Sequence, residues 1–305
     1  MAEDLEPTPP TIHDQIEHDA TPDQAAAVEA GAQKSPSLLD APATYLLLFI
    51  NLLWFAAMAK SAPGTYSADW HAHKYFSILT DSFSVEALQF WGGCDTGLVL
   101  NHGQWIRVLT ACFIHLNPLH MLVNMWCLWN LGLLGEPLLG RRGLFAVYML
   151  TGMAGNLCSL GANAFPPFRD GLVVGASGAV FGIAGILIVL LSNRKLSLPW
   201  DELRKLRRSV VQFAFLNLII GMAPQVVLPM ISNKMLNHEL SPLTRIDNMA
   251  HLGGLACGLL MGLPLFPRML TGRAGYRERQ RLTFAGTTFL LLLFAYSIVK
   301  FHSTK

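Results

Sequence analysis

Long apolar runs alternate with short polar segments along the chain. Seven runs of 17 to 23 residues carry no charged side chain: 42–59, 112–134, 143–162, 172–192, 209–231, 249–266 and 283–299. A helix needs about 20 apolar residues to cross a bilayer, and its backbone groups must bond within the segment because lipid offers no partners. Pro224 and Pro229 predict a kink or a break in the fifth helix. The pattern predicts an all-α polytopic membrane protein with a six-helix bundle and a seventh, C-terminal transmembrane helix.

Positive charge divides the connecting loops into two groups. The loops after the second, fourth and sixth runs hold thirteen Lys and Arg residues, whereas the opposite loops hold six. Cytosolic loops of membrane proteins are enriched in these two residues. We therefore expect a cytosolic N-terminus and a C-terminus on the outer side. No organelle-targeting signal is evident, so a bacterial cytoplasmic membrane is the expected location.

Composition separates an N-terminal tail from the membrane part. Hydrophobic residues make up 52% of the 305-residue chain and charged residues 14%, against about 25% charged in soluble domains. Residues 1–40 hold nine Asp and Glu, one Lys and no apolar signal region, which predicts a disordered acidic cytosolic tail. Residues 41–267 would form the six-helix core, and 268–305 a basic cytosolic linker with the seventh helix. The net charge of +2 makes no case for nucleic acid as a partner.

The first outer loop, 60–111, is long and rich in aromatic side chains. These residues are Trp70, Tyr75, Phe76, Phe83, Phe90, Trp91 and Trp105. Trp and Tyr concentrate at the interface between lipid and water. We expect part of this loop to lie in the membrane surface rather than to project as a soluble subdomain.

Polar residues interrupt three of the apolar runs at corresponding places. His120 and Asn124 follow the start of the second run, Ser177 lies near the start of the fourth, and His251 near the start of the sixth. In the expected topology these three helices all run from the outside inward. At about 1.5 Å per residue the polar groups then lie at similar depth, one or two turns below the outer surface. Ionisable and strongly polar groups inside spans are costly and usually functional.

These residue types predict acyl-transfer chemistry. A Ser hydroxyl is a weak nucleophile until a base takes its proton, and His251 can hold and return that proton near neutral pH. Gly175 and Gly178 flank Ser177 and permit close backbone approach. The N–H groups at a helix start can face a developing oxyanion. His120 and Asn124 share one helix face and can donate to the same oxyanion.

Helices four and six must touch for Ser177 to reach His251. Small residues four apart allow membrane helices to pack closely. Gly178 and Gly182 form one such pair, and Gly254 and Gly258 form the other. Close packing would therefore serve the predicted site directly.

Four segments, taken together, resemble the rhomboid family of intramembrane serine proteases. They are HLNPLHMLVN (115–124), GASG (175–178), AHLGGLACG (250–258) and QWIRVLT (104–110). The first three resemble the family's motifs H-x4-H-x3-N, GxSG and AHxxGxxxG, and the last resembles its WR-containing first-loop segment. The four segments follow one another along this chain in the same order as in the family. The resemblance implies a rhomboid-like six-helix core, a Ser177–His251 dyad, and an oxyanion hole made of His120, Asn124 and the Ser177 backbone N–H.

The resemblance also implies supporting roles. Phe181 would lie against the catalytic imidazole. Arg107 would match the arginine of the first loop, and Glu136 would help to brace that loop. The family's tryptophan before the arginine is replaced here by Ile106. Asp247, four residues before His251, is a candidate third member of a triad, although the family works with a dyad.

The residues that other classes of intramembrane protease require are missing from the apolar runs and motifs of this chain. The apolar runs hold no Asp for an aspartyl pair and no Lys for a Ser–Lys pair, and the chain has no HExxH or CxxC motif for a metal. We expect no metal or other cofactor. The five cysteines, an odd and mostly intramembrane set, do not form a disulfide framework. The expected function is a serine endopeptidase that cleaves single-span membrane proteins in the lipid bilayer through an acyl-enzyme. A non-catalytic rhomboid-like binder of membrane clients is the alternative, and a channel or transporter ranks third.

Overall fold

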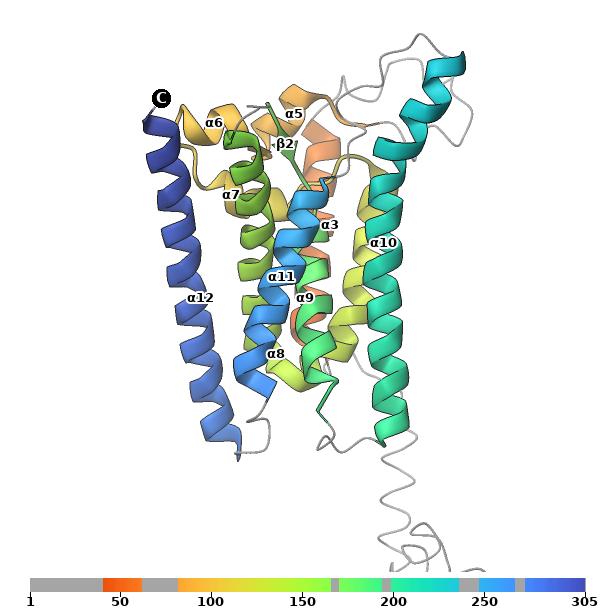
Figure 1. Ribbon diagram of the computed structural model, residues 1–305, viewed down its shortest axis with the longest axis vertical. Helices are drawn as coiled ribbons and strands as arrows, with labels where there is room; N and C mark the ends of the chain where they lie inside the picture. Colours follow the sequence, from red (N-terminus) through yellow and green to blue (C-terminus); the bar gives the residue numbers. More distant parts are fainter. Residues whose placement is uncertain are drawn as a thin grey trace, which may run out of the picture. The chain divides into compact units, whose positions relative to one another are not determined.

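The computed structural model describes residues 41–61, 82–165, 170–193, 199–235, 247–266 and 272–304. Its long elements are helices: α3 (Pro42–Ser61), α8 (Pro118–Ala164), α9 (Ser177–Leu190), α10 (Trp200–Met235), α11 (Asn248–Leu265) and α12 (Gly272–Ser303). Figure 1 shows these helices standing roughly side by side. The predicted tail, 1–40, lies outside the described residues, and the proposed division into core and linker stays a prediction.

The 47-residue helix α8 consists of two helices joined at a bend. Gly140 has φ 73° and ψ 160°, so the helical backbone is interrupted there. Positive φ strains side chains other than glycine, which explains why glycine stands at the bend. At the start of α8, the Asn117 side chain accepts a hydrogen bond from the backbone N–H of His120 (2.7 Å) and caps the helix. The two halves correspond to the second and third predicted spans.

Within the part of the chain that the structure describes, four helices are long and apolar enough to cross a membrane: α3, α8, α11 and Gly275–Ser303 of α12. At 14 residues α9 is shorter. The helical membrane fold is thus confirmed, whereas the number of seven spans stays a prediction. The backbone of α10 is helical through Pro224 and Pro229 to Met235, so the helix is not broken there, and Figure 1 shows its last part leaning away from the rest.

The predicted helix over 172–192 begins five residues too early. Leu172–Val173 forms the short strand β2, which pairs antiparallel with β1 (Cys94–Asp95), and α9 starts only at Ser177. The apolar run could not reveal this because an apolar strand and an apolar helix look alike over a few residues. The strand pair ties the entry of α9 to the first loop.

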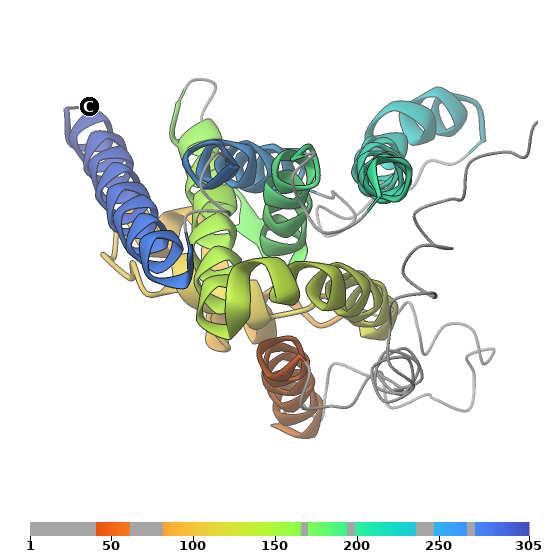
Figure 2. The ribbon, with the colours of Figure 1, turned by 90° about the horizontal axis from the view of Figure 1, so that it is seen from below.

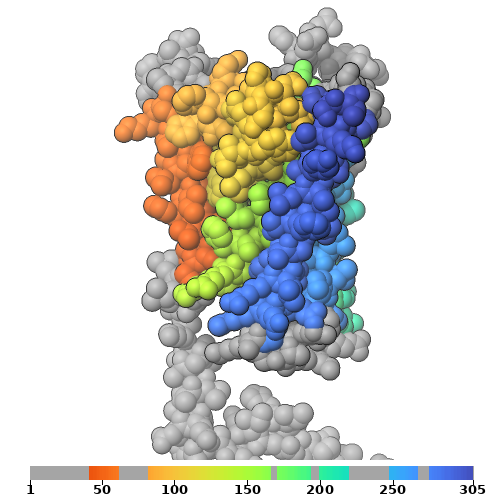
Figure 3. All heavy atoms as spheres, turned by 90° about the vertical axis from the view of Figure 1, so that its left-hand side faces the viewer, coloured from red at the N-terminus to blue at the C-terminus, as the bar shows by residue number. Residues whose placement is uncertain are grey.

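The first loop folds against the bundle. Its described part contains α5 (Val85–Phe90), α6 (Thr96–Leu100), α7 (Arg107–Thr110) and the 3-10 helix η2 (Ala111–Phe113). Figure 3 shows this part of the first loop, in yellow, covering the upper part of one side of the bundle between α3 and α12. Phe90 and Ile106 are 82% and 65% exposed. This position agrees with the expected interfacial loop, although 62–81 lie outside the described residues.

Helix α9 is the centre of the core. Ala179, Ile183, Ile186 and Leu187 on α9 are fully buried, and Figure 2 shows α8 and α11 packed beside this helix. In contrast, α12 exposes most of its apolar side chains, including Phe289 and Leu292. An apolar surface of this length suits contact with lipid.

Candidate active site

Ser177 and His251 meet across the interface between α9 and α11. Ser177 is the first residue of α9, and His251 lies at the end of the first turn of α11. The distance between Ser177 Oγ and His251 Nε2 is 2.8 Å, which is a hydrogen bond. His251 is only 6% exposed, whereas Ser177 is half-buried. The geometry is that of a hydroxyl beside a base that can take its proton.

Glycines make this contact possible. A Cβ added at Gly254 would overlap the carbonyl oxygen of Gly178, and one added at Gly258 would overlap that of Gly182. The backbones of α9 and α11 therefore touch directly at both glycine pairs. Close packing through small residues is the usual device where helices associate in a membrane.

Phe181 lies one turn after Ser177 and stacks on the imidazole of His251. The ring centroids are 4.4 Å apart, and the ring planes differ by 14°. Both side chains are buried. The stacked ring restrains the rotation of the imidazole, so the Nε2 atom stays directed at Ser177.

Asp247 does not act on His251. Its carboxylate caps α11, accepting hydrogen bonds from the backbone N–H groups of Met249 (2.9 Å) and Ala250 (3.1 Å). The Ser159 hydroxyl also donates to this carboxylate. Within the described residues, His251 Nδ1 has no hydrogen-bond partner. A capping role accounts for Asp247, and the candidate triad is not formed.

His120 lies beside the loop that leads into α9. Gly175, at φ 128°, packs against the imidazole: a Cβ there would lie 2.9 Å from His120 Cε1 and 3.7 Å from Ser177 Oγ. The backbone N–H of Leu116 points at His120 Nδ1 at 3.4 Å. If Nδ1 accepts this bond, the proton of the neutral ring is on Nε2. The glycine at 175 is therefore required by both its backbone angle and the neighbouring ring.

Asn124 is buried but is not bonded to Ser177. Its side-chain amide donates to the carbonyl oxygen of His120 (2.9 Å), one turn earlier in α8. An amide has a second N–H. Asn124 thus lies one turn from His120 on α8, while its part in the site stays a prediction.

His115 begins the 115–124 motif, but no role was predicted for it. It is fully buried, and its Nε2 lies 3.5 Å from the backbone nitrogen of Ala176. Its ring also contacts the edge of the His120 ring at a centroid distance of 5.4 Å. The contact with Ala176 holds the backbone directly before Ser177. Its place in the 115–124 motif was the available signal.

Helix side chains fasten the first loop above the site. Asn156 of α8 donates to the carbonyl of Val108 (2.9 Å), and the Tyr148 hydroxyl donates to that of Cys112 (2.8 Å). Arg107 braces the loop internally through Gln104 (2.6 Å) and the carbonyl of Gly93 (3.1 Å). The role of Asn156 could not be predicted from the sequence, because its partner is a backbone group that no residue pattern identifies.

Glu136 does not brace the first loop, contrary to the expectation. Its buried carboxylate accepts from the backbone N–H groups of Ala43 (2.9 Å) and Thr44 (2.8 Å) and from the Thr44 hydroxyl (2.7 Å). It thus satisfies the free N–H groups at the start of α3. Glu136 lies sixteen residues after His120 on α8, about 24 Å along the helix, so it cannot reach the loop.

The described residues contain no group of three or more His, Cys, Asp or Glu side chains that could hold a metal ion. All five cysteines are free. Ser177, His251 and the donors around them form the candidate site. Together, the fold and the site define a helical membrane protein with a serine–histidine pair at one end of its bundle.

Comparison with known proteins identifies the family. The Rhomboid domain model matches residues 102–268, more than half of the chain. The chain belongs to the rhomboid family. It is 30% identical to "Rhomboid protease GluP" of Bacillus subtilis (strain 168) over 226 residues, 72% of this chain and 35% of that protein. It is 29% identical to "RHOMBOID-like protein 1" of Arabidopsis thaliana over 198 residues, 64% of this chain and 43% of that protein.

Coverage differs among the relatives. The chain spans about a third of the Bacillus relative and less than half of the Arabidopsis one. It covers 75% of "Rhomboid-like protease 1" of Toxoplasma gondii, at 29% identity over 246 residues and 77% of this chain. Because the relatives come from such different organisms, the similarity does not favour the expected bacterial origin. It does agree with a multi-pass integral membrane protein.

Proposed function

We propose that this chain is a serine endopeptidase that cleaves transmembrane segments of single-span membrane proteins. The observation that carries the proposal is the 2.8 Å hydrogen bond between Ser177 Oγ and His251 Nε2. Ser177 attacks the scissile carbonyl carbon while His251 takes the hydroxyl proton. The tetrahedral intermediate then collapses, the C–N bond breaks, and His251 returns the proton to the departing amine. An acyl-enzyme remains on Ser177, and water, deprotonated by His251, hydrolyses it.

The oxyanion would be bound at the start of α9. The Ser177 backbone N–H is among the first N–H groups of that helix, which have no partner within the helix, and the helix dipole favours negative charge there. His120, with its proton on Nε2, is the side-chain donor on the opposite side. Asn124, on the same face of α8 as His120, would donate the N–H of its side-chain amide that is not bonded to the His120 carbonyl. Removing one such donor typically slows acyl transfer by about a hundredfold to a thousandfold.

His251 works without a carboxylate partner in this proposal. Asp247 is engaged in capping α11, and Phe181 is stacked on the imidazole. Ring stacking orients the base in place of a third polar residue. A dyad therefore needs Phe181 as a positioning residue, which gives the stacking contact a testable role.

The substrate would reach Ser177 laterally, past α10. The outward face of α10 exposes large apolar side chains, among them Phe215 and Leu216 at 65% and 57%. Val210 and Ala214 are buried on the other face. The buried face of α10 is narrow over the side chains described, 200–219, and such a helix can move with less loss of packing than α9 or α11. From the distribution of Lys and Arg, we infer that this end of the bundle faces the outside and that the N-terminus is cytosolic.

The test is cleavage of a model single-span substrate co-reconstituted in vesicles. The parent chain should release two fragments, and Ser177→Ala and His251→Ala should release none. A mechanism-based serine-hydrolase reagent, such as an isocoumarin, should label the parent and fail to label Ser177→Ala. Cleavage that persists in Ser177→Ala would refute the assignment. A parent chain that binds the substrate without cutting it or reacting with the reagent would instead favour the non-catalytic client binder.

A further inference from the structure

A cavity of about 440 Å³ lies at the end of the bundle opposite Ser177. It is formed where the bend of α8 meets the first turns of α12. Its lining is Leu139, Gly140, Arg141, Arg142, Gly143, Arg277, Gln280, Arg281 and Phe284. None of these residues belongs to the site around Ser177. The predicted serine chemistry therefore leaves this cavity without a function.

The lining is strongly basic. Arg141 and Arg142 come from α8, Arg277 and Arg281 come from α12, and none of the described residues that line the cavity is acidic. The ion pairs found in the described part of the chain both lie on α10, Arg204–Asp201 and Lys205–Glu202. These four exposed arginines, with no carboxylate among the described lining residues, give this end of the bundle a positive potential that attracts an anion.

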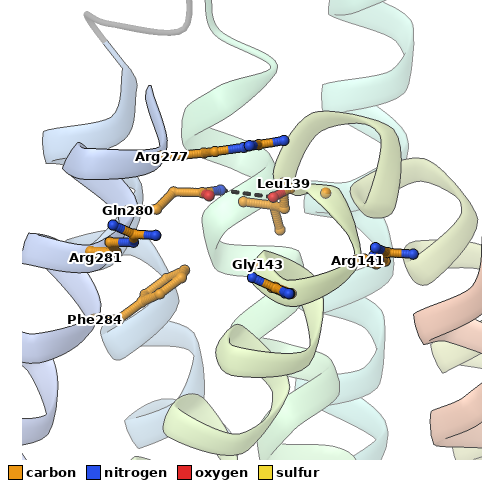
Figure 4. Close-up of a pocket in the computed structure, with 9 residues that line it drawn as sticks. Leu139, Arg141, Gly143, Arg277, Gln280, Arg281 and Phe284 are labelled. Carbon is orange, nitrogen blue, oxygen red and sulfur yellow. Dashed lines mark hydrogen bonds between the residues drawn. The ribbon is translucent and has the colours of Figure 1, made fainter. Parts of the chain in front are cut away.

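Hydrogen bonds hold the two sides of the cavity in place. Gln280 donates to the carbonyl of Leu139 (2.7 Å), and the Tyr276 hydroxyl donates to that of Leu138 (3.1 Å). Figure 4 shows the Gln280–Leu139 bond, with Arg277 extending from α12 toward the bend and Arg141 beyond it. Two of the carbonyls that end the first half of α8, those of Leu138 and Leu139, are thus already satisfied. They do not present their negative ends to the cavity.

The bend itself favours an anion. The second half of α8 starts again after Gly140, so its first N–H groups have no partner within the helix. These groups and the positive end of the helix dipole attract negative charge. The helix start adds to the four arginines and is not the basis of the site. Guanidinium groups match the oxygen pattern of a phosphate in a bidentate way.

The surroundings identify a lipid as the source of the phosphate. Phe284 lines the cavity, and beyond it α12 continues with exposed apolar side chains, including Phe289 and Leu290 at 60% and 64%. Acyl chains can lie along that surface while the headgroup occupies the basic cavity. Basic pockets between membrane helices commonly receive anionic headgroups. We propose that the cavity binds the phosphodiester headgroup of an anionic phospholipid and so joins α12 to the bend of α8.

Lipid binding to the full-length chain in a neutral detergent tests the proposal. Native mass spectrometry would follow short-chain phosphatidylglycerol, with phosphatidylcholine of the same chain length as the neutral comparison. Phosphatidylglycerol should bind at least about tenfold more tightly, since charge-assisted hydrogen bonds distinguish the two lipids. Equal binding of both lipids would overturn the proposal. Inorganic phosphate at the same concentration should compete weakly, and competition as strong as that of the lipid would overturn the lipid assignment.

A pair of double variants separates the cavity from general surface charge. Arg277→Gln with Arg281→Gln removes two cavity charges but keeps Gln280. Arg204→Gln with Arg208→Gln removes two charges from α10. The first pair should weaken phosphatidylglycerol binding about tenfold or more, and the second should change it by less than about twofold. Equal losses in the two pairs would overturn the proposal.

The parent chain provides a measurement that does not depend on the folding of a variant. A photoactivatable phosphatidylglycerol with its reactive group next to the headgroup would be crosslinked to the chain and located by peptide mapping. Labelling concentrated in residues 139–143 and 277–284 is the expected result. Labelling distributed evenly over the other helices at that end would overturn the proposal.

Discussion

Gly254→Ala tests the claim that helix contact sets the distance between nucleophile and base. The added methyl group would lie closer to the Gly178 carbonyl oxygen than the 3.0 Å that Cβ atoms keep from such atoms. The obstacle is backbone on both sides, so no side chain can rotate away. The α9 and α11 backbones must separate by roughly 1 Å, and a misplacement of that size costs about a hundredfold in rate.

The added methyl group would lie close to both proposed catalytic residues, so it should affect the distance between Ser177 and His251. Gly254 is one turn after His251, and Gly178 directly follows Ser177. The separation therefore lengthens the 2.8 Å bond between the two site residues beyond the range of a good hydrogen bond. We also expect a loss of stability of about 1–3 kcal/mol from overpacking.

The assay combines substrate cleavage with thermal unfolding in one detergent. Gly254→Ala should lower the rate about a hundredfold at a temperature where the chain remains folded. Gly286→Ala on α12 is the matched control, because a Cβ there would meet nothing within 4 Å. A Gly254→Ala chain that cleaves within about threefold of the parent, while Gly286→Ala does the same, would refute the reasoning.

Three further variants test individual contacts. Asp247→Ala should lower the unfolding free energy by about 0.5–2 kcal/mol through loss of the α11 cap and keep cleavage within about tenfold of the parent; a loss of several hundredfold would revive the triad. Glu136→Ala should destabilise the chain by about 1–3 kcal/mol, because N–H groups at the start of α3 lose their acceptor; an unchanged unfolding temperature would contradict the capping role. Phe181→Leu should slow labelling of Ser177 by the serine reagent while lowering the unfolding temperature only slightly. Rescue of the labelling rate by Phe181→Tyr would distinguish ring stacking from simple packing.

Several features of the candidate site followed from local patterns. The apolar runs predicted the helices of the membrane part, and the ordered motifs around His120, Ser177 and His251 predicted which residues would meet. Glycine spacing predicted the contact between α9 and α11. These patterns are reliable because a membrane helix must carry its own hydrogen bonds and apolar surface within one short segment.

Predictions about partners that are distant in sequence were less successful. Glu136 was expected at the first loop and instead caps α3, and Asp247 was a candidate partner of His251 and instead caps its own helix. A carboxylate bonds to whichever donors lie within about 3 Å. Spacing along a helix determines its face and depth but not the groups that approach from other elements.

The sequence by itself determined the membrane helices, the family and the residues that converge near one end. Only the tertiary structure decided that β2 holds the entry to α9, that Asp247 caps α11 instead of bonding to His251, and that four arginines from α8 and α12 line one cavity. The physical reason is the range of the interactions involved. Hydrophobic periodicity and helix-forming patterns act within a segment, whereas caps, ring stacking and charge clusters depend on backbone groups and side chains that folding brings together from far along the chain.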